Sequence, residues 1–145
     1  MKLIETSLSI ALHAYAGKTD KAGREYILHP LRVMAKMKTD EEMSAALLHD
    51  VIEDSDITAE QLLAEGIPAE VVEAVICLTK NDGEDYQDFV AKAKKNILAR
   101  TVKIADIEDN IDVLQLASLD ENAMDRIKKY HTAWRFLNDE DQETK

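Results

Sequence analysis

The segment over residues 45–54, AALLHDVIED, constrains the fold most strongly. Its apolar first half runs directly into His49-Asp50, and the acidic pair Glu53-Asp54 follows. Residues four apart are neighbours on a helix, so Asp50 and Asp54 share one face there. The apolar side of such a helix is expected to be buried, and carboxylates beside a buried surface are costly unless a partner neutralises them. The segment therefore predicts an interior helix whose polar groups bind a metal ion or transfer protons.

Apolar residues recur at helical spacing through most of the chain, and no segment shows the alternation typical of a strand. Thr39 or Asp40 is suited to cap the helix of the opening segment, Thr58 begins a capping box, and Gly17 and Gly66 are helix stops. The predicted helices cover residues 3–15, a short segment opened by His29-Pro30, 41–54, 58–66, 68–78, 86–93, 104–114 and 124–134. We therefore expect a single all-α domain of about eight helices over residues 1–138, followed by an acidic tail over residues 139–145.

Length and charge exclude several classes of protein. A chain of 145 residues holds one domain with a proper core. Its net charge of −11 argues against general nucleic-acid binding through a basic face. No run is apolar enough to span a bilayer. The single Cys77 has no partner within the chain, which indicates a reducing compartment, and we expect a cytoplasmic protein.

Three further side chains are candidates for chemistry, and each has a structural alternative. His29 lies between a polar loop and a helix start, where a histidine is more often a surface or capping residue. His49 alone would more often be a core histidine. Asp106 follows an apolar run, where an unpaired carboxylate is expensive. Its alternative is a buried salt bridge to Lys103 or Arg100.

Two histidines and two aspartates, with Asp50 as the fourth group, form a mixed nitrogen and oxygen donor set. This set suits Mn²⁺, Fe²⁺, Co²⁺, Mg²⁺ or Zn²⁺ with open coordination positions and does not suit a closed structural zinc site. The alternative for Glu53 and Asp54 is an ordinary acidic helix end, although the helix dipole disfavours negative charge at a C-terminus.

The order of these residues resembles the H…HD…D pattern of the HD-domain metal-dependent phosphohydrolases. The resemblance is closer to one branch, the hydrolase domain of the Rel/Spo alarmone enzymes and their small stand-alone relatives, which remove the 3′-diphosphate from guanosine tetraphosphate. The segments that match are residues 23–33 (GREYILHPLRV, like GxPYIxHPxxVA), 45–54 (like AALLHDVVEDT), 78–80 (LTK, like VTK) and 102–110 (VKIADIEDN, like VKLADxxxN). The match runs from about Leu8 to Trp134.

The resemblance implies a metal-dependent pyrophosphohydrolase in which Glu53 and Asp54 position and deprotonate the attacking water. The implied metal ligands are His29, His49, Asp50 and Asp106. The implied metal is Mn²⁺, with Fe²⁺, Co²⁺, Mg²⁺, Zn²⁺ and Ni²⁺ as the other candidates. The expected partner is a small-molecule nucleotide, without nucleic acid or membrane, and the sequence does not specify an oligomeric state. The expected substrate-binding residues are Lys18, Lys21, Lys103, Asn110, Arg126 and Tyr130.

Three acidic residues depart from the pattern of this branch. Asp20 stands where the alarmone hydrolases have an Arg, and Asp109 and Asp112 replace a His and an Arg near the site. Added carboxylates oppose a strongly anionic substrate. Two alternatives follow: an HD-type nucleotidase or phosphatase for a less charged nucleotide, and a non-catalytic nucleotide-binding sensor. Retention of Glu53-Asp54 argues against the sensor, which has no need of a water-activating pair.

Overall fold

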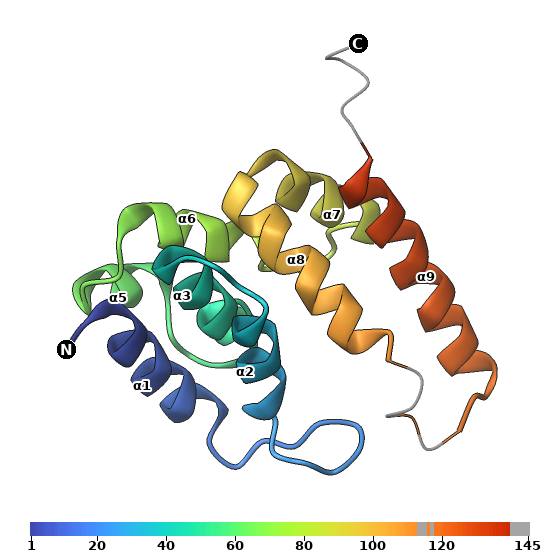
Figure 1. The fold of residues 1–145 in the computed structure, drawn as a ribbon, viewed down its shortest axis with the longest axis horizontal. Helices are drawn as coiled ribbons and strands as arrows, with labels where there is room; N and C mark the ends of the chain where they lie inside the picture. Colours follow the sequence, from blue (N-terminus) through green and yellow to red (C-terminus); the bar gives the residue numbers. More distant parts are fainter. Residues whose placement is uncertain (113–115, 117, 140–145) are drawn as a thin grey trace.

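The computed structural model describes residues 1–112, 116 and 118–139 of the chain. Within this part the chain forms nine helices and no strand, and its one isolated β-bridge joins Thr19 to Glu25 (Figure 1). The predicted all-α class is confirmed. The helices are α1 (Leu3–Tyr15), α2 (Leu28–Ala35), α3 (Asp40–Leu48), α4 (Val51–Asp54), α5 (Ala59–Ala64), α6 (Ala69–Cys77), α7 (Tyr86–Lys95), α8 (Ile97–Asn110) and α9 (Glu121–Asn138).

Helix α3 is the centre of the larger core. It packs against α1, α2, α6 and α8, and its residues 44–48 are all fully buried. A smaller apolar cluster joins α7, α8 and α9 through Val90, Ile107, Ala133 and Leu137. Helix α8 thus belongs to both groups and connects them across the molecule (Figure 1). None of the described helices combines the length and the apolar character needed to cross a membrane.

Local capping signals define several helix ends as predicted. Thr39 and Thr58 each accept a hydrogen bond from the backbone N–H three residues ahead, at 3.1 and 3.2 Å, and both complete capping boxes. Gly17 and Gly66 follow the last turns of α1 and α5 with φ of 78° and 93°. A side chain would be strained in this left-handed conformation, so glycine is the residue suited to both positions. Pro68 caps α6.

The prediction of one continuous helix over residues 41–54 is wrong. Helix α3 ends at Leu48, α4 starts at Val51, and Asp50 between them has φ −105° and ψ 4°. This sparsely populated backbone conformation turns the chain, and the hydroxyl of Tyr26 donates a hydrogen bond to the Asp50 carboxylate beside it. His49 and Asp50 therefore lie at a corner between two helices, and the helix count rises from eight to nine.

Other boundaries differ by a few residues. Helix α2 begins at Leu28, so Pro30 is its third residue and not its first. Helix α8 begins at Ile97, earlier than predicted, because the Asn96 side chain caps it. The predicted end of that helix at Leu114 lies outside the described residues, as does the predicted acidic tail apart from Asp139.

Candidate active site

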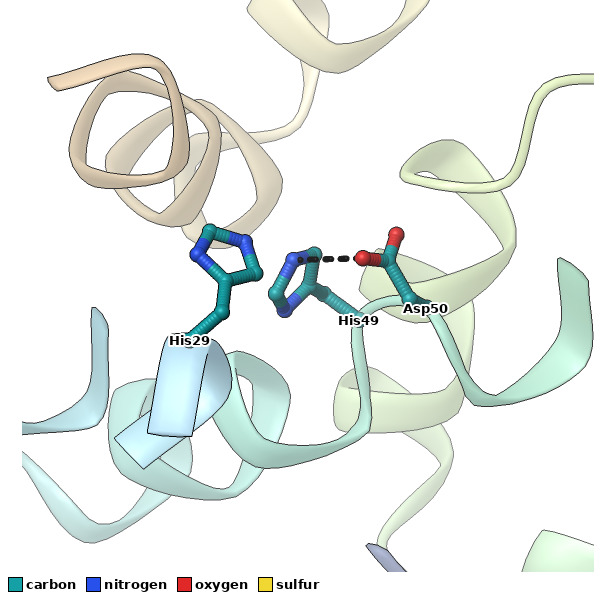
Figure 2. Close-up of side chains that lie close together, drawn as sticks. All are labelled: His29, His49 and Asp50. Atoms are coloured by element: carbon teal, nitrogen blue, oxygen red, sulfur yellow. Dashed lines mark ion pairs between the residues drawn. The ribbon is translucent and has the colours of Figure 1, made fainter. Parts of the chain in front are cut away.

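Three predicted metal ligands converge from two parts of the chain. His29 comes from α2, and His49 and Asp50 come from the corner between α3 and α4; Figure 2 shows their side chains grouped together, with the ion pair between His49 and Asp50 dashed. One potential ligand atom from each residue lies within 4.8 Å of the other two. The two histidine side chains are 7% and 2% exposed, so the cluster is almost closed to solvent on its histidine side.

The fourth predicted ligand, Asp106 of α8, joins this cluster. Its Oδ1 lies 2.8 Å from His29 Nε2 and 3.3 Å from His49 Nε2, and it accepts a hydrogen bond from Asn110 Nδ2 at 3.1 Å. Its Oδ2 accepts from Lys103 Nζ at 3.0 Å. The salt bridge considered as the structural alternative is therefore present, with Lys103 as the partner. The two oxygens are divided between these roles, because Oδ1 faces the histidines and Oδ2 faces the lysine.

One ring nitrogen of His49, Nε2, is buried without a hydrogen-bond partner among the described residues. Its Nδ1 donates to the carbonyl oxygen of Ala46 at 2.6 Å. Its buried Nε2 forms no hydrogen bond within the described residues, although carboxylate oxygens of Asp50 and Asp106 lie 3.2 and 3.3 Å away. Leaving such an atom unsatisfied is costly, and a ring nitrogen whose opposite N–H is held by a carbonyl is well prepared to ligate a metal. The donor set and this atom fit a divalent cation.

Charge coupling within the cluster is strong. Burial lowers the pKa of His49, but the nearby Asp50 and Asp106 carboxylates outweigh this effect and raise its pKa well above the usual value. Burial raises the pKa of Asp106, yet Lys103 and the two histidines hold its pKa well below the usual range. The cluster therefore carries ionised carboxylates, the form in which Asp ligates metals.

Both residues of the predicted catalytic pair, Glu53 and Asp54, lie in the last part of α4. Glu53 Oε1 accepts a hydrogen bond from the backbone N–H of Lys80 at 2.9 Å, which ties α4 to the segment after α6. Burial, together with the charges of Asp50 and Glu53, raises the pKa of Asp54 to about 6. Lys18 Nζ donates to the backbone oxygen of Asp54. The two carboxylates therefore differ in role: a hydrogen bond fixes the position of the Glu53 carboxylate, whereas the Asp54 carboxylate has a pKa closer to neutral pH.

A cleft of about 390 Å³ opens beside His29. Residues of the loop over 16–27, α2, the end of α8 and α9 contribute to its lining. In Figure 1 this loop lies on the same side of the molecule as the end of α8 and the start of α9. Four of the six predicted substrate-binding residues line it. The lining residues are Thr19, Asp20, Lys21, Ala22, Tyr26, His29, Arg32, Asp109, Asn110, Asp112, Leu116, Arg126 and Tyr130.

The other two predicted substrate-binding residues do not line this cleft. Lys103 is 8% exposed and bound to Asp106 beneath the cluster. Lys18 lines a separate hollow next to Tyr15 and donates to Asp54. Both lysines instead donate hydrogen bonds to acceptors of the protein itself, which sequence spacing does not reveal.

The cleft carries both signs of charge. Lys21 from the loop and Arg126 from α9 both line it, and burial together with the nearby charge of Arg126 lowers the pKa of Lys21. Such a pair favours an anionic ligand. Asp20, Asp109 and Asp112 line the same cleft, which reduces its positive character.

Arg32 was not among the predicted site residues, although it lies in the matched segment around His29. Its Nε and Nη2 donate to the two carboxylate oxygens of Asp109 at 2.7 and 3.0 Å. Asp109 also bonds to His29, at 2.6 Å. Burial raises the pKa of Asp109, but these hydrogen bonds outweigh it and lower that pKa to about 2. A local sequence signal for this contact does not exist, because its partners lie on two helices distant in the chain.

No family model matches the chain. Curated relatives include the guanosine-3′,5′-bis(diphosphate) 3′-pyrophosphohydrolases of Vibrio cholerae, 34% identical over 128 residues (79% of this chain, 18% of that protein), and of Haemophilus influenzae, 39% identical over 119 residues (72% and 18%). The bifunctional (p)ppGpp synthase/hydrolase SpoT of Escherichia coli is 34% identical over 129 residues (79% and 18%). The chain spans less than a fifth of the length of these three relatives.

A solved structure supports the fold. It is described as a metazoan ortholog of SpoT that hydrolyses ppGpp and plays a role in starvation responses. Its TM-score to this chain is 0.77 at 22% sequence identity, and the match covers 94% of this chain and 85% of that one.

Proposed function

We propose that this chain, a relative of the guanosine-3′,5′-bis(diphosphate) 3′-pyrophosphohydrolases over most of its length, is itself a metal-dependent phosphohydrolase that releases diphosphate from the 3′ position of ppGpp. The observation that carries the proposal is the convergence of His29, His49, Asp50 and Asp106 next to a cleft that contains Lys21 and Arg126. These four residues would hold the metal ion, for which Mn²⁺ is our first candidate. We also propose a cytoplasmic location, which the single Cys77 supports because lone thiols are typical of reducing compartments.

When bound, a divalent ion at these ligands would supply Lewis-acid activation of water and of the phosphoryl group. The chain's own residues supply the remaining functions. Asp54 accepts the proton of the attacking water, since its pKa of about 6 leaves it ionised yet basic near neutral pH. Glu53, anchored by the Lys80 N–H, orients that water. Lys21 and Arg126 bind the phosphates, with Tyr130 and Asn110 beside them in the cleft.

The test is a hydrolysis panel in the presence of Mn²⁺ with ppGpp, pppGpp, NADPH and common nucleoside mono- and triphosphates. Diphosphate release from ppGpp by the wild type, lost in Asp106→Ala, supports the proposal. Glu108→Gln is the matched control, because Glu108 lies on the same helix but pairs with Lys36 and Trp134 on the outer surface. Absence of diphosphate release from ppGpp at saturating Mn²⁺ overturns the alarmone assignment.

A second candidate is an HD-type nucleotidase or phosphatase for a less charged nucleotide. Asp20 and Asp112 in the cleft lining favour it, because each opposes additional phosphates. Orthophosphate release from another nucleotide, with ppGpp untouched, would select this candidate. A sensor would instead bind nucleotide in Glu53→Ala as in the wild type, with no turnover in either.

A further inference from the structure

Asp109 connects a cleft arginine to a ligand histidine. Its Oδ1 accepts from Arg32 Nε at 2.7 Å, and its Oδ2 accepts from Arg32 Nη2 at 3.0 Å and contacts His29 Nδ1 at 2.6 Å. The side chains of Asp109 and His29 are 8% and 7% exposed. The three residues form a continuous set of hydrogen bonds between α2 and α8, which we call the Arg32–Asp109–His29 chain.

This arrangement determines which nitrogen of His29 is available. A guanidinium fork fixes the plane of the carboxylate it binds and keeps it ionised, and an ionised carboxylate only accepts hydrogen bonds. The proton of the short contact therefore resides on His29 Nδ1. By the same reasoning the opposite nitrogen, Nε2, donates to the ionised Asp106 Oδ1 at 2.8 Å, and a divalent cation bound at the cluster would take the place of this second proton.

We infer that Asp109 is a positioning residue that holds His29 with Nε2 toward the divalent cation, and that Arg32 fixes Asp109 for this task. The inference rests on the metal site of the proposed function. A metal-bound histidine commonly donates its other N–H to a carboxylate, which fixes the ring orientation and raises ligand basicity. Asp109, which departs from the pattern of the branch, thus has a role at the proposed metal site, and the paired Arg32 guanidinium offsets its charge at the wall of the cleft.

The experiment measures Mn²⁺ affinity by isothermal titration on the full chain, without substrate. Loss of an outer-shell carboxylate typically weakens metal binding 10–100-fold. We expect this loss in Asp109→Ala, a smaller loss in the isosteric Asp109→Asn, and a loss in Arg32→Lys, which keeps the charge but not the fork. Glu108→Gln removes the same charge from the neighbouring position and breaks the exposed pair with Lys36, so its affinity stays within threefold of the wild type.

Nuclear magnetic resonance of the Zn²⁺-loaded protein gives a second readout. The His29 Nδ1 proton is expected to be observable and slow to exchange in the wild type, and to exchange rapidly in Asp109→Ala. If Asp109→Ala does not fold, Asp109→Asn and Arg32→Lys provide both the Mn²⁺ affinity and the exchange rate of the Nδ1 proton.

Two results overturn the inference. One is Mn²⁺ affinity in the Asp109 variants within threefold of the wild type. The other is tighter nucleotide binding in Asp109→Asn with an unchanged Nδ1 proton, which would make Asp109 only a charge opposing the substrate. A wild type that binds Mn²⁺ but leaves ppGpp intact overturns the proposed function alone, because neither readout here depends on turnover.

Discussion

Replacing Lys103 by Met tests whether this lysine stabilises Asp106, the fourth metal ligand that we propose, or binds substrate. Met retains most of the apolar stem and removes the ammonium, which lies 3.0 Å from Asp106 Oδ2 and 4.8 Å from the centre of the Phe89 ring. Removing one partner of a buried ion pair costs about 3–5 kcal/mol. We expect the lower limit, about 3 kcal/mol in the metal-free protein, because Asp106 Oδ1 keeps its contacts with His29 and Asn110.

The assay is urea unfolding followed by circular dichroism, in EDTA and in excess Mn²⁺. A loss of about 3 kcal/mol lowers the folding equilibrium constant by roughly a hundredfold. Bound Mn²⁺ places a positive charge beside Asp106 again, so we expect the ion to stabilise the variant more than the wild type. The matched control is Lys36→Met, which breaks a 3.6 Å exposed ion pair to the same helix and is expected to cost less than about 1 kcal/mol.

The contribution of the Lys103–Asp106 ion pair to folding stability depends on pH with a defined sign. The pKa of Lys103 is raised in the folded protein. Its contribution to folding stability is therefore fully present below the ordinary pKa of lysine and is lost only as pH rises through the raised value. The pKa of Asp106 is lowered, so its contribution is lost as pH falls through that low value. The penalty of Lys103→Met should therefore be constant from mildly acidic to mildly basic pH. A metal-free variant within about 1 kcal/mol of the wild type, with a raised KM, would refute this reasoning and restore Lys103 as a substrate-binding residue.

The remaining predictions concern the pair on α4, the cleft, the metal and a helix cap. If Asp54 is the general base, the hydrolysis rate rises with pH through about 6 and then levels off; a flat profile from pH 5 to 8 would contradict this role. Its raised pKa also makes the folded protein less stable as pH rises from about 4 to 6, because the folded state retains the proton more strongly, and Asp54→Asn should abolish that slope. Lys21→Ala and Arg126→Ala should each raise KM for ppGpp about tenfold at low salt with little change in kcat; equal KM values across salt concentrations would argue against phosphate binding. Mn²⁺ at a hundred times its Kd should stabilise the chain by about 2.7 kcal/mol in thermal unfolding, a gain that EDTA reverses. Thr58→Ala should cost about 1 kcal/mol in urea unfolding, and no change would mean that the cap is not used.

Local chemistry allowed most helices to be predicted. Thr39 and Thr58 cap backbone N–H groups within their own turns, and Gly17 and Gly66 adopt positive φ at helix ends, so the information needed lies within a few residues. The interruption at Asp50 depends instead on partners outside its own helix. The Tyr26 hydroxyl reaches the Asp50 carboxylate from the loop before α2, and periodicity within residues 41–54 contains no trace of that contact.

In the candidate site, too, some features could be predicted from the sequence, while others depend on contacts between distant parts of the chain. The motif order placed His29, His49, Asp50 and Asp106 in one group, and the structure brings their side chains together. Charge alone did not identify which lysines face the cleft, because Lys103 is held by Asp106 on the buried side. For Asp109 the sequence predicted repulsion of the substrate, since its partner Arg32 lies far away in the chain.

His29, His49, Asp50 and Asp106 come from three separate places in the chain, and this has a consequence for biogenesis. During synthesis α2 and the corner between α3 and α4 leave the ribosome first, carrying His29, His49 and Asp50, and α8 with Asp106 follows only after α5, α6 and α7. The nascent chain therefore lacks a complete ligand set until most of the domain has emerged. If Asp106 is a ligand as proposed, metal binding would have to wait until α8 packs against α3, and a ribosome-stalled fragment ending before α8 should retain little Mn²⁺.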